Sequence, residues 1–231
     1  MLVLAFDQRL ASLDADTFIQ QLLVDSLGVK HLVVGDDFRF GRDRQGDYGH
    51  LQRRGEQLGF AVERTATCLL DDQRVSSSRI RQALAASDLA QAEACLGRHV
   101  SFCGRVEKGH QRGRTIGFPT ANVSLKRALS PVRGVFAVQV HGLADAPLPG
   151  VANIGNRPTV AGDERFLLEV HLFDFKQDIY GRKLVVELVH FIRDEQRFDS
   201  FDALRQQIEA DALQARHFFN LPEPLASGLS K

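Results

Sequence analysis

The chain has 231 residues, of which 44% are apolar and 25% charged, and its 29 basic and 29 acidic side chains balance to a formal charge of zero. This composition is typical of a globular protein and argues against a disordered chain or a strongly basic nucleic-acid-binding domain. No apolar run approaches the ~20 residues that a bilayer-spanning helix needs, and the N-terminus lacks a signal-peptide pattern. We therefore expect a cytoplasmic protein of two small domains.

Short apolar runs alternate with helical patterns in the first part of the chain. Strands are predicted at 2–6, 31–35 and 60–65, with one helix that ends at Gly28 and a second that follows Asp47 and ends near Gly59. Strands that alternate with helices pair in parallel through right-handed crossovers. Two short helices then lead to Gly97, so residues 1–96 are predicted to form an incomplete, Rossmann-like α/β domain.

After Gly97 the pattern changes to that of a β protein. Segments rich in β-branched and aromatic residues, with Gly or Pro between them, occur at 99–106, 134–141, 148–154, 165–173 and 183–192. A small antiparallel barrel accommodates such strands best. Residues 200–219 carry apolar side chains at helical spacing and are predicted to form a terminal helix that packs on the barrel.

A basic stretch at the start of the predicted barrel indicates an anion site. Between Arg98 and Arg133 there are eight Lys or Arg and a single acid, Glu107. Glycines that allow close approach of the backbone to a phosphate recur there at Gly104, Gly109, Gly113 and Gly117. His110 and Gln111 stand where a Walker A loop requires Lys and Ser or Thr, which excludes a P-loop kinase. A solvated hairpin loop is the alternative.

Oxygen-bearing side chains follow this loop. Thr120 and Asn122 point to one face of a strand, and Mg²⁺ takes one or two such protein ligands beside phosphate oxygens. A polar barrel rim would look the same. Glu169, in the alternating run LLEVHLF, could accept a proton from a substrate hydroxyl. Glu187 has nearly the same setting, so the local pattern leaves the choice of base open.

Five motifs of the second half occur in the order found in one enzyme family: GRVEKGHQRGRTIGFPTAN, GVANIGNRPTV, LEVHLFDF, DIYG and FIRDEQRFDSFDAL. Residues from about 97 to 220 closely resemble the riboflavin kinase domain of bacterial bifunctional riboflavin kinase/FMN adenylyltransferases, or FAD synthetases. The resemblance implies a six-stranded antiparallel β-barrel with a C-terminal helix. It also implies that residues 97–221 phosphorylate riboflavin to FMN from Mg-ATP, with 222–231 as a tail.

The resemblance assigns roles to individual residues. Thr120 and Asn122 would bind Mg²⁺ with the ATP phosphates, and Glu169 would be the catalytic base for the terminal ribityl hydroxyl. The residues near ATP would be Gly109, Gly113, Arg114, Leu172, Asp174 and Tyr180. The flavin would be bordered by Arg193, Gln196 and Phe198.

Two motifs of the first half resemble the FMN adenylyltransferase domain of the same family. The motifs VVGDDFRFGR and VSSSRIR supply the candidate residues Asp36, Phe38, Ser76, Ser77, Ser78 and Arg81. Hydroxyls and an arginine at a helix N-terminus suit a triphosphate. However, the family's G-x-F-D-G-V-H-x-G-H motif is absent, and the eight histidines form no H-x-x-H or H-x-G-H pair. We therefore expect 1–96 to be a partial domain without its first strand and helix, in which FAD formation is lost or very weak.

Alternatives to a kinase with an incomplete second site remain. The chain could be a fragment of a longer, fully bifunctional enzyme, or a flavin-binding module without turnover. The expected ligands are riboflavin, ATP and Mg²⁺, with neither nucleic acid nor membrane as a partner. The incomplete sheet would expose an edge and apolar surface, which self-association through the first domain would cover.

Overall fold

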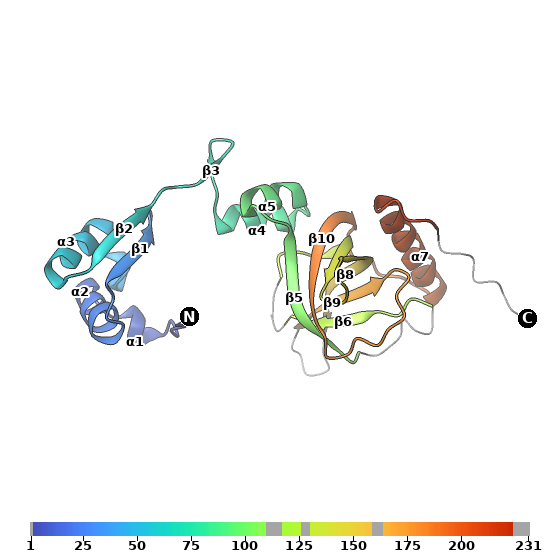
Figure 1. The fold of residues 1–231 in the computed structure, drawn as a ribbon, viewed down its shortest axis with the longest axis horizontal. Coiled ribbons are helices and arrows are strands. Elements are labelled where there is room, and N and C mark those ends of the chain that lie inside the picture. Colours follow the sequence, from blue (N-terminus) through green and yellow to red (C-terminus); the bar gives the residue numbers. More distant parts are fainter. Residues whose placement is uncertain (1, 110–116, 126–129, 159–163, 224–231) are drawn as a thin grey trace, which may run out of the picture. The chain divides into compact units, whose positions relative to one another are not determined.

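The protein forms two compact units, Met1–Val75 and Ser76–Lys231, and each is considered by itself (Figure 1). The computed structural model describes residues 2–109, 117–125, 130–158 and 164–223. Within these residues, no helix is both long and apolar enough to cross a membrane.

The first unit is a small α/β structure. Its elements are α1 (Gln8–Ala11), α2 (Ala15–Thr17), the π-helix η1 (Phe18–Ser26), β1 (His31–Gly35), the 3₁₀-helix η2 (Arg42–Arg44), α3 (Tyr48–Leu58), β2 (Ala61–Thr65), β3 (Leu69–Leu70) and β4 (Gln73–Arg74). Strands β1 and β2 pair in parallel with His31 opposite Ala61, as the predicted crossover requires. The fully buried Ile19 and Leu51 anchor the helices to this pair.

Helix α3 begins and ends where the capping residues predict. The Asp47 side chain accepts a hydrogen bond from the backbone N–H of His50 at 2.8 Å. Gly59 ends the helix in a left-handed conformation, with φ of 80°, which glycine adopts without steric cost. These caps explain why the boundaries of α3 can be predicted within a residue.

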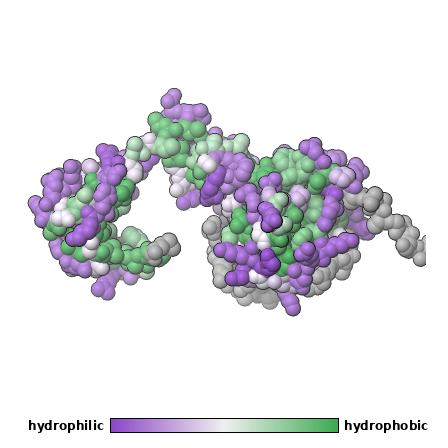
Figure 2. Space-filling model, viewed as in Figure 1, coloured by the Kyte–Doolittle hydropathy of each residue, from purple (hydrophilic) through white to green (hydrophobic). Residues whose placement is uncertain are grey.

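The predicted strand at 2–6 is wrong. Among the described residues this segment pairs with no strand, and Leu2, Val3, Leu4 and Phe6 are 44% to 84% exposed. A strand needs a neighbour for its backbone N–H and C=O groups, so an apolar run alone does not make one. Figure 2 shows the apolar surface of the first unit next to the grey first residue.

The second unit contains a closed six-stranded antiparallel barrel, which confirms the prediction. Its elements are α4 (Ser77–Ala85), α5 (Leu89–Leu96), β5 (Val100–Glu107), β6 (Ala121–Ser124), β7 (Gly134–His141), β8 (Leu148–Pro158), β9 (Glu164–Leu172), β10 (Lys183–Arg193) and α7 (Phe201–Phe218). The strand order around the barrel is β10-β5-β6-β9-β8-β7. Helices α4 and α5, which lie within residues 1–96, group with this unit and share the barrel's core.

The barrel has an inner and an outer apolar layer. Phe136, Ile154 and Leu168 fill the interior and are fully buried. Alternate residues point outward, and Val135 and Phe173 pack with residues of α7 such as Ala215. Helix α7 therefore covers one outer face of the barrel, against β7, β8 and β10 (Figure 1).

Replacing Phe136 by Ala should lower the free energy of unfolding of the second unit by about 3–5 kcal/mol, because it leaves a cavity in the centre of the barrel. Urea denaturation at fixed temperature measures this loss. Phe201→Ala is the matched control, since Phe201 is 56% exposed, and its effect should stay below about 1 kcal/mol. Equal losses in the two variants would contradict this account of the core.

Candidate active site

A row of polar side chains crosses the outer face of the barrel. Asn122 of β6 lies directly opposite Glu169 of β9, and Glu169 lies directly opposite Asn153 of β8. Side chains of directly opposed residues point to the same face, with Cβ atoms about 4.5–5.5 Å apart. All three residues are half-buried. The fold thus gathers two amides and one carboxylate from three strands.

Asn153 has no assigned role in the sequence analysis. Its signal is a single polar residue in the otherwise apolar run Val151-Ala152-Asn153-Ile154, where the neighbours Ala152 and Ile154 are buried in the core. Alternation places Asn153 on the outer face, but its position beside Glu169 depends on strand register, which only the folded barrel provides.

Gly109 lies directly over Asn122. A Cβ atom at position 109 would overlap the amide group of the Asn122 side chain. Only a glycine allows the backbone after β5 to come this close to the proposed metal ligand. The structure therefore brings together two residues that the resemblance assigns to ATP and to Mg²⁺. Gly113 and Arg114, the other predicted residues of this loop, lie outside the described residues.

A hollow opens beside Thr120. Thr120, Leu172 and Tyr180 line it together with Phe175 and Ile179. Three of the residues predicted to bind metal or ATP thus border one space. The remaining predicted nucleotide residue, Asp174, does not line the hollow but forms an ion pair with Arg216 of α7 at 2.8 Å.

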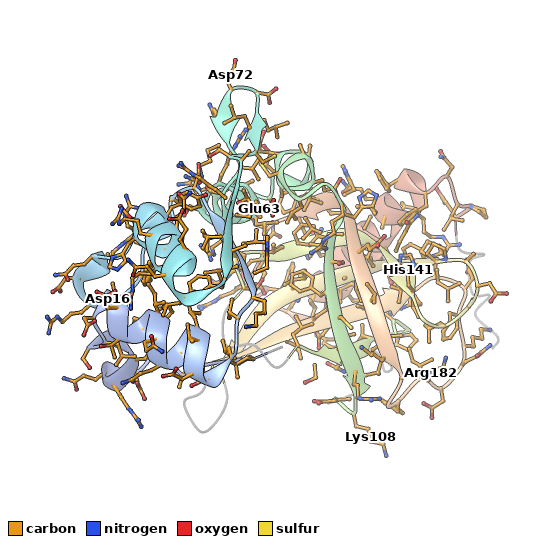
Figure 3. The ribbon with its side chains drawn as sticks, turned by 60° about the vertical axis from the view of Figure 1, so that its left-hand side comes forward. Asp16, Glu63, Asp72, Lys108, His141 and Arg182 are labelled. Carbon is orange, nitrogen blue, oxygen red and sulfur yellow. The ribbon has the colours of Figure 1, made fainter. Side chains whose placement is uncertain are left out.

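Basic residues at the end of β5 contact the segment that forms the wall of this hollow. The Gly181 carbonyl accepts a hydrogen bond from Arg105 at 2.9 Å, and Lys108 lies 5.9 Å from the centre of the Tyr180 ring. Lys108 and Arg182 lie at the same end of the barrel in Figure 3. One cation, Lys108, therefore contacts the wall of the hollow, and the acidic Asp178 also lines it.

His171 holds the segment that leads to Thr120. Its Nδ1 lies 2.9 Å from the Pro119 carbonyl, and its ring packs edge-on against Phe118 and Phe173. Burial lowers the pKa of His171 below its ordinary value of 6.5, and the charge of Arg216 lowers it further, while the Pro119 carbonyl opposes the shift. The neutral ring, with Nδ1–H donating to Pro119, is thus the favoured form.

The protein should lose stability in acid through His171. Because the folded pKa is depressed, its contribution is complete above pH 6.5 and is lost as the pH falls below 6.5 through the folded pKa. The loss is at most about 1.4 kcal/mol per pH unit, the slope for one proton. Urea denaturation between pH 7.5 and 5.5 should show a smaller decrease in His171→Gln, which can still donate to Pro119 and does not titrate.

A second histidine, His99, also contributes to the pH dependence of stability, so the effect of His171 must be isolated by comparing the wild type with His171→Gln. A hydrogen bond and the charge of Glu93 raise the pKa of His99, whose Nδ1 lies 2.9 Å from the Glu93 carboxylate. Its contribution has the opposite sign, since it is present below pH 6.5 and lost as the pH rises through the raised pKa. An unchanged pH dependence in His171→Gln would contradict the role of His171.

The predicted flavin residues lie at the end of β10 and in the segment that follows it. Arg193 stacks over the Phe198 ring with 5.7 Å between the guanidinium carbon and the ring centre. Gln196, between them, is exposed. Arg193 lies opposite Val135, which in turn lies opposite Asn153, so the segment starts in the same cross-strand row as Glu169.

Glu187 is placed elsewhere. It lies on β10 between Ser101 and Gln139 and forms an ion pair with His141 at 3.0 Å. The structure thus distinguishes the two glutamates that the local pattern leaves equivalent, because only Glu169 is opposite Asn122.

The residues with adenylyltransferase resemblance are divided between the units. In the first, Asp36 accepts a hydrogen bond from Thr67 and forms an ion pair with Arg74 at 3.0 Å, and Phe38 stacks on Phe40. The hydrogen bond from Thr67 lowers the pKa of Asp36, and the charges of Arg74 and Arg64 lower it further by smaller amounts. In the second unit, the Ser76 hydroxyl caps α4 by accepting from the backbone of Arg79, and Ser77, Ser78 and Arg81 follow on that helix.

The donor set around Glu169 fits Mg²⁺. The metal prefers hard oxygen ligands and keeps sites for waters and phosphates. The Thr120 hydroxyl is exposed, and the Asn122 amide and Glu169 carboxylate face each other across two strands. Oxygen donors on a closed barrel, beside a hollow whose Tyr180 wall is contacted by Lys108, suit an enzyme that transfers phosphate groups.

Comparison with known proteins identifies the family. Residues 96–219 match the family model of riboflavin kinase, and residues 1–79 match that of FAD synthetase. The bifunctional riboflavin kinase/FMN adenylyltransferase of Escherichia coli K12 is 54% identical over 97% of this chain and 71% of its own length. That of Haemophilus influenzae is 50% identical over 95% and 71%. The chain therefore belongs to the bifunctional riboflavin kinase/FMN adenylyltransferase family.

A solved structure agrees with the fold. The crystal structure of a protein named a macrolide-efflux protein, from Streptococcus pneumoniae, superposes with a TM-score of 0.70 at 34% identity, and the match covers 89% of this chain and 66% of that one. The family membership makes this protein an enzyme of flavin nucleotide synthesis, in a family that uses riboflavin and ATP with Mg²⁺.

Proposed function

We propose that this chain phosphorylates riboflavin to FMN from Mg-ATP, and that residues 97–221 perform the reaction, with 222–231 as a tail. The observation that carries the proposal is the opposition of Asn122 and Glu169 beside the hollow that Thr120 and Tyr180 border. This arrangement supports a common site for the proposed metal ligands, the proposed base and the nucleotide.

Each residue has a distinct part in the reaction. The Glu169 carboxylate accepts the proton of the terminal ribityl hydroxyl as that oxygen attacks the γ-phosphorus, and ADP leaves with the electrons of the broken P–O bond. Bound Mg²⁺ supplies charge neutralisation, and Thr120 and Asn122 would hold it. Gly109, Leu172, Asp174 and Tyr180 would border the nucleotide, and Arg193, Gln196 and Phe198 would border the flavin. Gly113 and Arg114, outside the described residues, stay predicted nucleotide residues.

Adenylylation of FMN is the second candidate function, and the match of residues 1–79 to FAD synthetase favours it. We infer that it is weak or absent in this 231-residue chain. The sequence has no paired histidines to stabilise charge on the transferred phosphate, and Ser76 is engaged as a helix cap. The remaining candidates, Ser77, Ser78 and Arg81 with Asp36 and Phe38, do not replace the missing histidines.

One incubation tests both activities. Purified protein is mixed with riboflavin, ATP and Mg²⁺, and the flavins are separated by chromatography. FMN without FAD is the expected product. FAD at an ordinary enzymatic rate would contradict the weak-adenylylation inference, whereas riboflavin that stays unchanged while still bound would support a binding module without turnover.

Cytoplasmic location and the absence of a nucleic-acid partner stay predictions. Self-association through the first unit also stays a prediction, motivated by the exposed Leu2, Val3 and Phe6. Sedimentation of the wild-type chain, compared with a variant in which these three residues are polar, would test it.

A further inference from the structure

Two buried charges on α7 have no role in the proposed chemistry. Asp211 and Arg216 are each only 5% exposed and are the charged side chains classed as buried among the described residues. Removing a charge from water is costly unless a partner and further hydrogen bonds compensate. Asp211 pairs with Arg193, in the segment proposed to border the flavin. Arg216 pairs with Asp174, in the segment proposed to border the nucleotide.

Asp211 holds the flavin side. Its two carboxylate oxygens accept from Arg193 Nε at 2.8 Å and Nη2 at 2.7 Å, and Gln207 donates to Oδ1 at 2.9 Å. This fork-to-fork geometry allows Arg193 one orientation. The remaining Nη1 of Arg193 donates to the Asp194 carbonyl at 2.8 Å, and the guanidinium stacks over Phe198. Asp211 therefore fixes the start of the segment that borders the flavin.

Arg216 holds the nucleotide side. Its Nη2 donates to Asp174 Oδ2 at 2.8 Å, its Nε donates to the Pro222 carbonyl at 2.7 Å, and its guanidinium lies 5.0 Å from the centre of the Phe173 ring. Asp174 has a left-handed backbone, with φ of 54°, which is uncommon for a residue other than glycine. The ion pair thus stabilises the turn that leads from β9 to Phe175 and Tyr180 in the wall of the hollow.

We propose that Asp211 and Arg216 are positioning residues that fix the two substrate borders separately, Asp211 for the flavin and Arg216 for ATP. The inference rests on the proposed kinase function. Neither residue touches the reacting atoms. Both act from a single helix, on positions five residues apart, but through different partners: Arg193 at the end of β10 and Asp174 after β9. Loss of one ion pair should therefore weaken the binding of one substrate and leave the binding of the other unchanged.

The test measures binding of each substrate to the full chain. Riboflavin binding is followed by quenching of its fluorescence, and Mg-ATP binding by calorimetry. Asp211→Asn should raise the Kd for riboflavin about tenfold and leave that for ATP within about twofold, because a modest misplacement of bordering groups is expected. Arg216→Gln should do the reverse. Steady-state KM values, measured on the same samples, should divide in the same way.

The controls separate positioning from folding. Glu209→Gln removes an exposed ion pair with Arg205 on the same helix, at 3.0 Å, and should change neither affinity. Asp211→Glu and Arg216→Lys keep the charges, and should recover part of the lost affinity. Thermal unfolding of each variant sets an assay temperature at which all are folded, and if Asp211→Asn or Arg216→Gln does not fold, the charge-keeping variants are judged by the same criterion.

The inference would be overturned if Asp211→Asn or Arg216→Gln changed the affinities for riboflavin and ATP equally, or changed neither. A wild-type chain that binds neither substrate would overturn the inference and the proposed function together. Failure of the proposed function alone would appear as binding of both substrates by the wild type without formation of FMN. The division of the two affinities therefore tests α7 independently of turnover.

Discussion

Glu169→Gln should lower kcat for FMN formation by about 10² to 10⁴-fold, the usual contribution of a general base. The substitution keeps the size of a side chain that faces Asn122 and Asn153, so the row of polar groups is preserved. The amide cannot take up the hydroxyl proton, however. Because the proposed borders of the flavin and of ATP are formed by other residues, the KM values should change little, and initial rates at saturating substrates measure the loss.

Glu187→Gln is the matched control for this prediction. Glu187 has the same alternating setting on β10, but its neighbours are Ser101, Gln139 and His141. Its kcat should stay within about twofold of the wild type, since it removes only a partly exposed ion pair. A large loss in Glu187→Gln with normal activity in Glu169→Gln would reverse the assignment of the base.

Gly109→Ala should lower kcat/KM for ATP by roughly 10²-fold, the effect of moving an active-site group by about 1 Å. A Cβ atom would overlap the Asn122 amide, so either the backbone after β5 or the proposed metal ligand must shift. The apparent affinity for Mg²⁺ should weaken with it, and titration of activity against Mg²⁺ at fixed ATP measures this.

Gly49→Ala serves as the control for that substitution. In α3, an added Cβ would meet only ordinary van der Waals contacts, with Arg53 at 3.4 Å. The kinase activity of Gly49→Ala should equal that of the wild type. Unaltered Mg²⁺ and ATP dependence in Gly109→Ala would mean that the loop readily adopts another path over Asn122, against the account given above.

Local patterns were sufficient for most elements of the fold. The bounds of β7 match the predicted 134–141, and the alternation predicted around Glu169 is seen in the buried Leu168 beside it. These properties depend on neighbours in sequence, which is why they can be predicted. The apolar run at 2–6 shows the limit, since its state depends on a pairing partner. Hairpin β3–β4 was missed because its turn uses Asp71 and Asp72, both with positive φ, in place of the usual glycine.

The residues that form the site could not all be predicted from the sequence, because their grouping depends on the strand register of the folded barrel. Glu169 and Glu187 have equivalent local patterns, and only cross-strand pairing separates them. Asn153 and Asp211 gave too weak a local signal to be chosen, because one polar residue in a strand or a helix is ordinary. Their partners, Glu169 and Arg193, are distant in sequence, so their importance follows from contacts that no local window contains.

The position of β10 between β5 and β7 has a consequence for synthesis on the ribosome. The strand that closes the barrel is the last one to be made, and it supplies the neighbour for both β5 and β7. Until it emerges, those two strands present open edges that can pair with other chains. Pairing of β5 with β10 also joins distant parts of the chain, which slows folding. The nascent second unit is therefore open to pairing with other chains until β10 has left the ribosome.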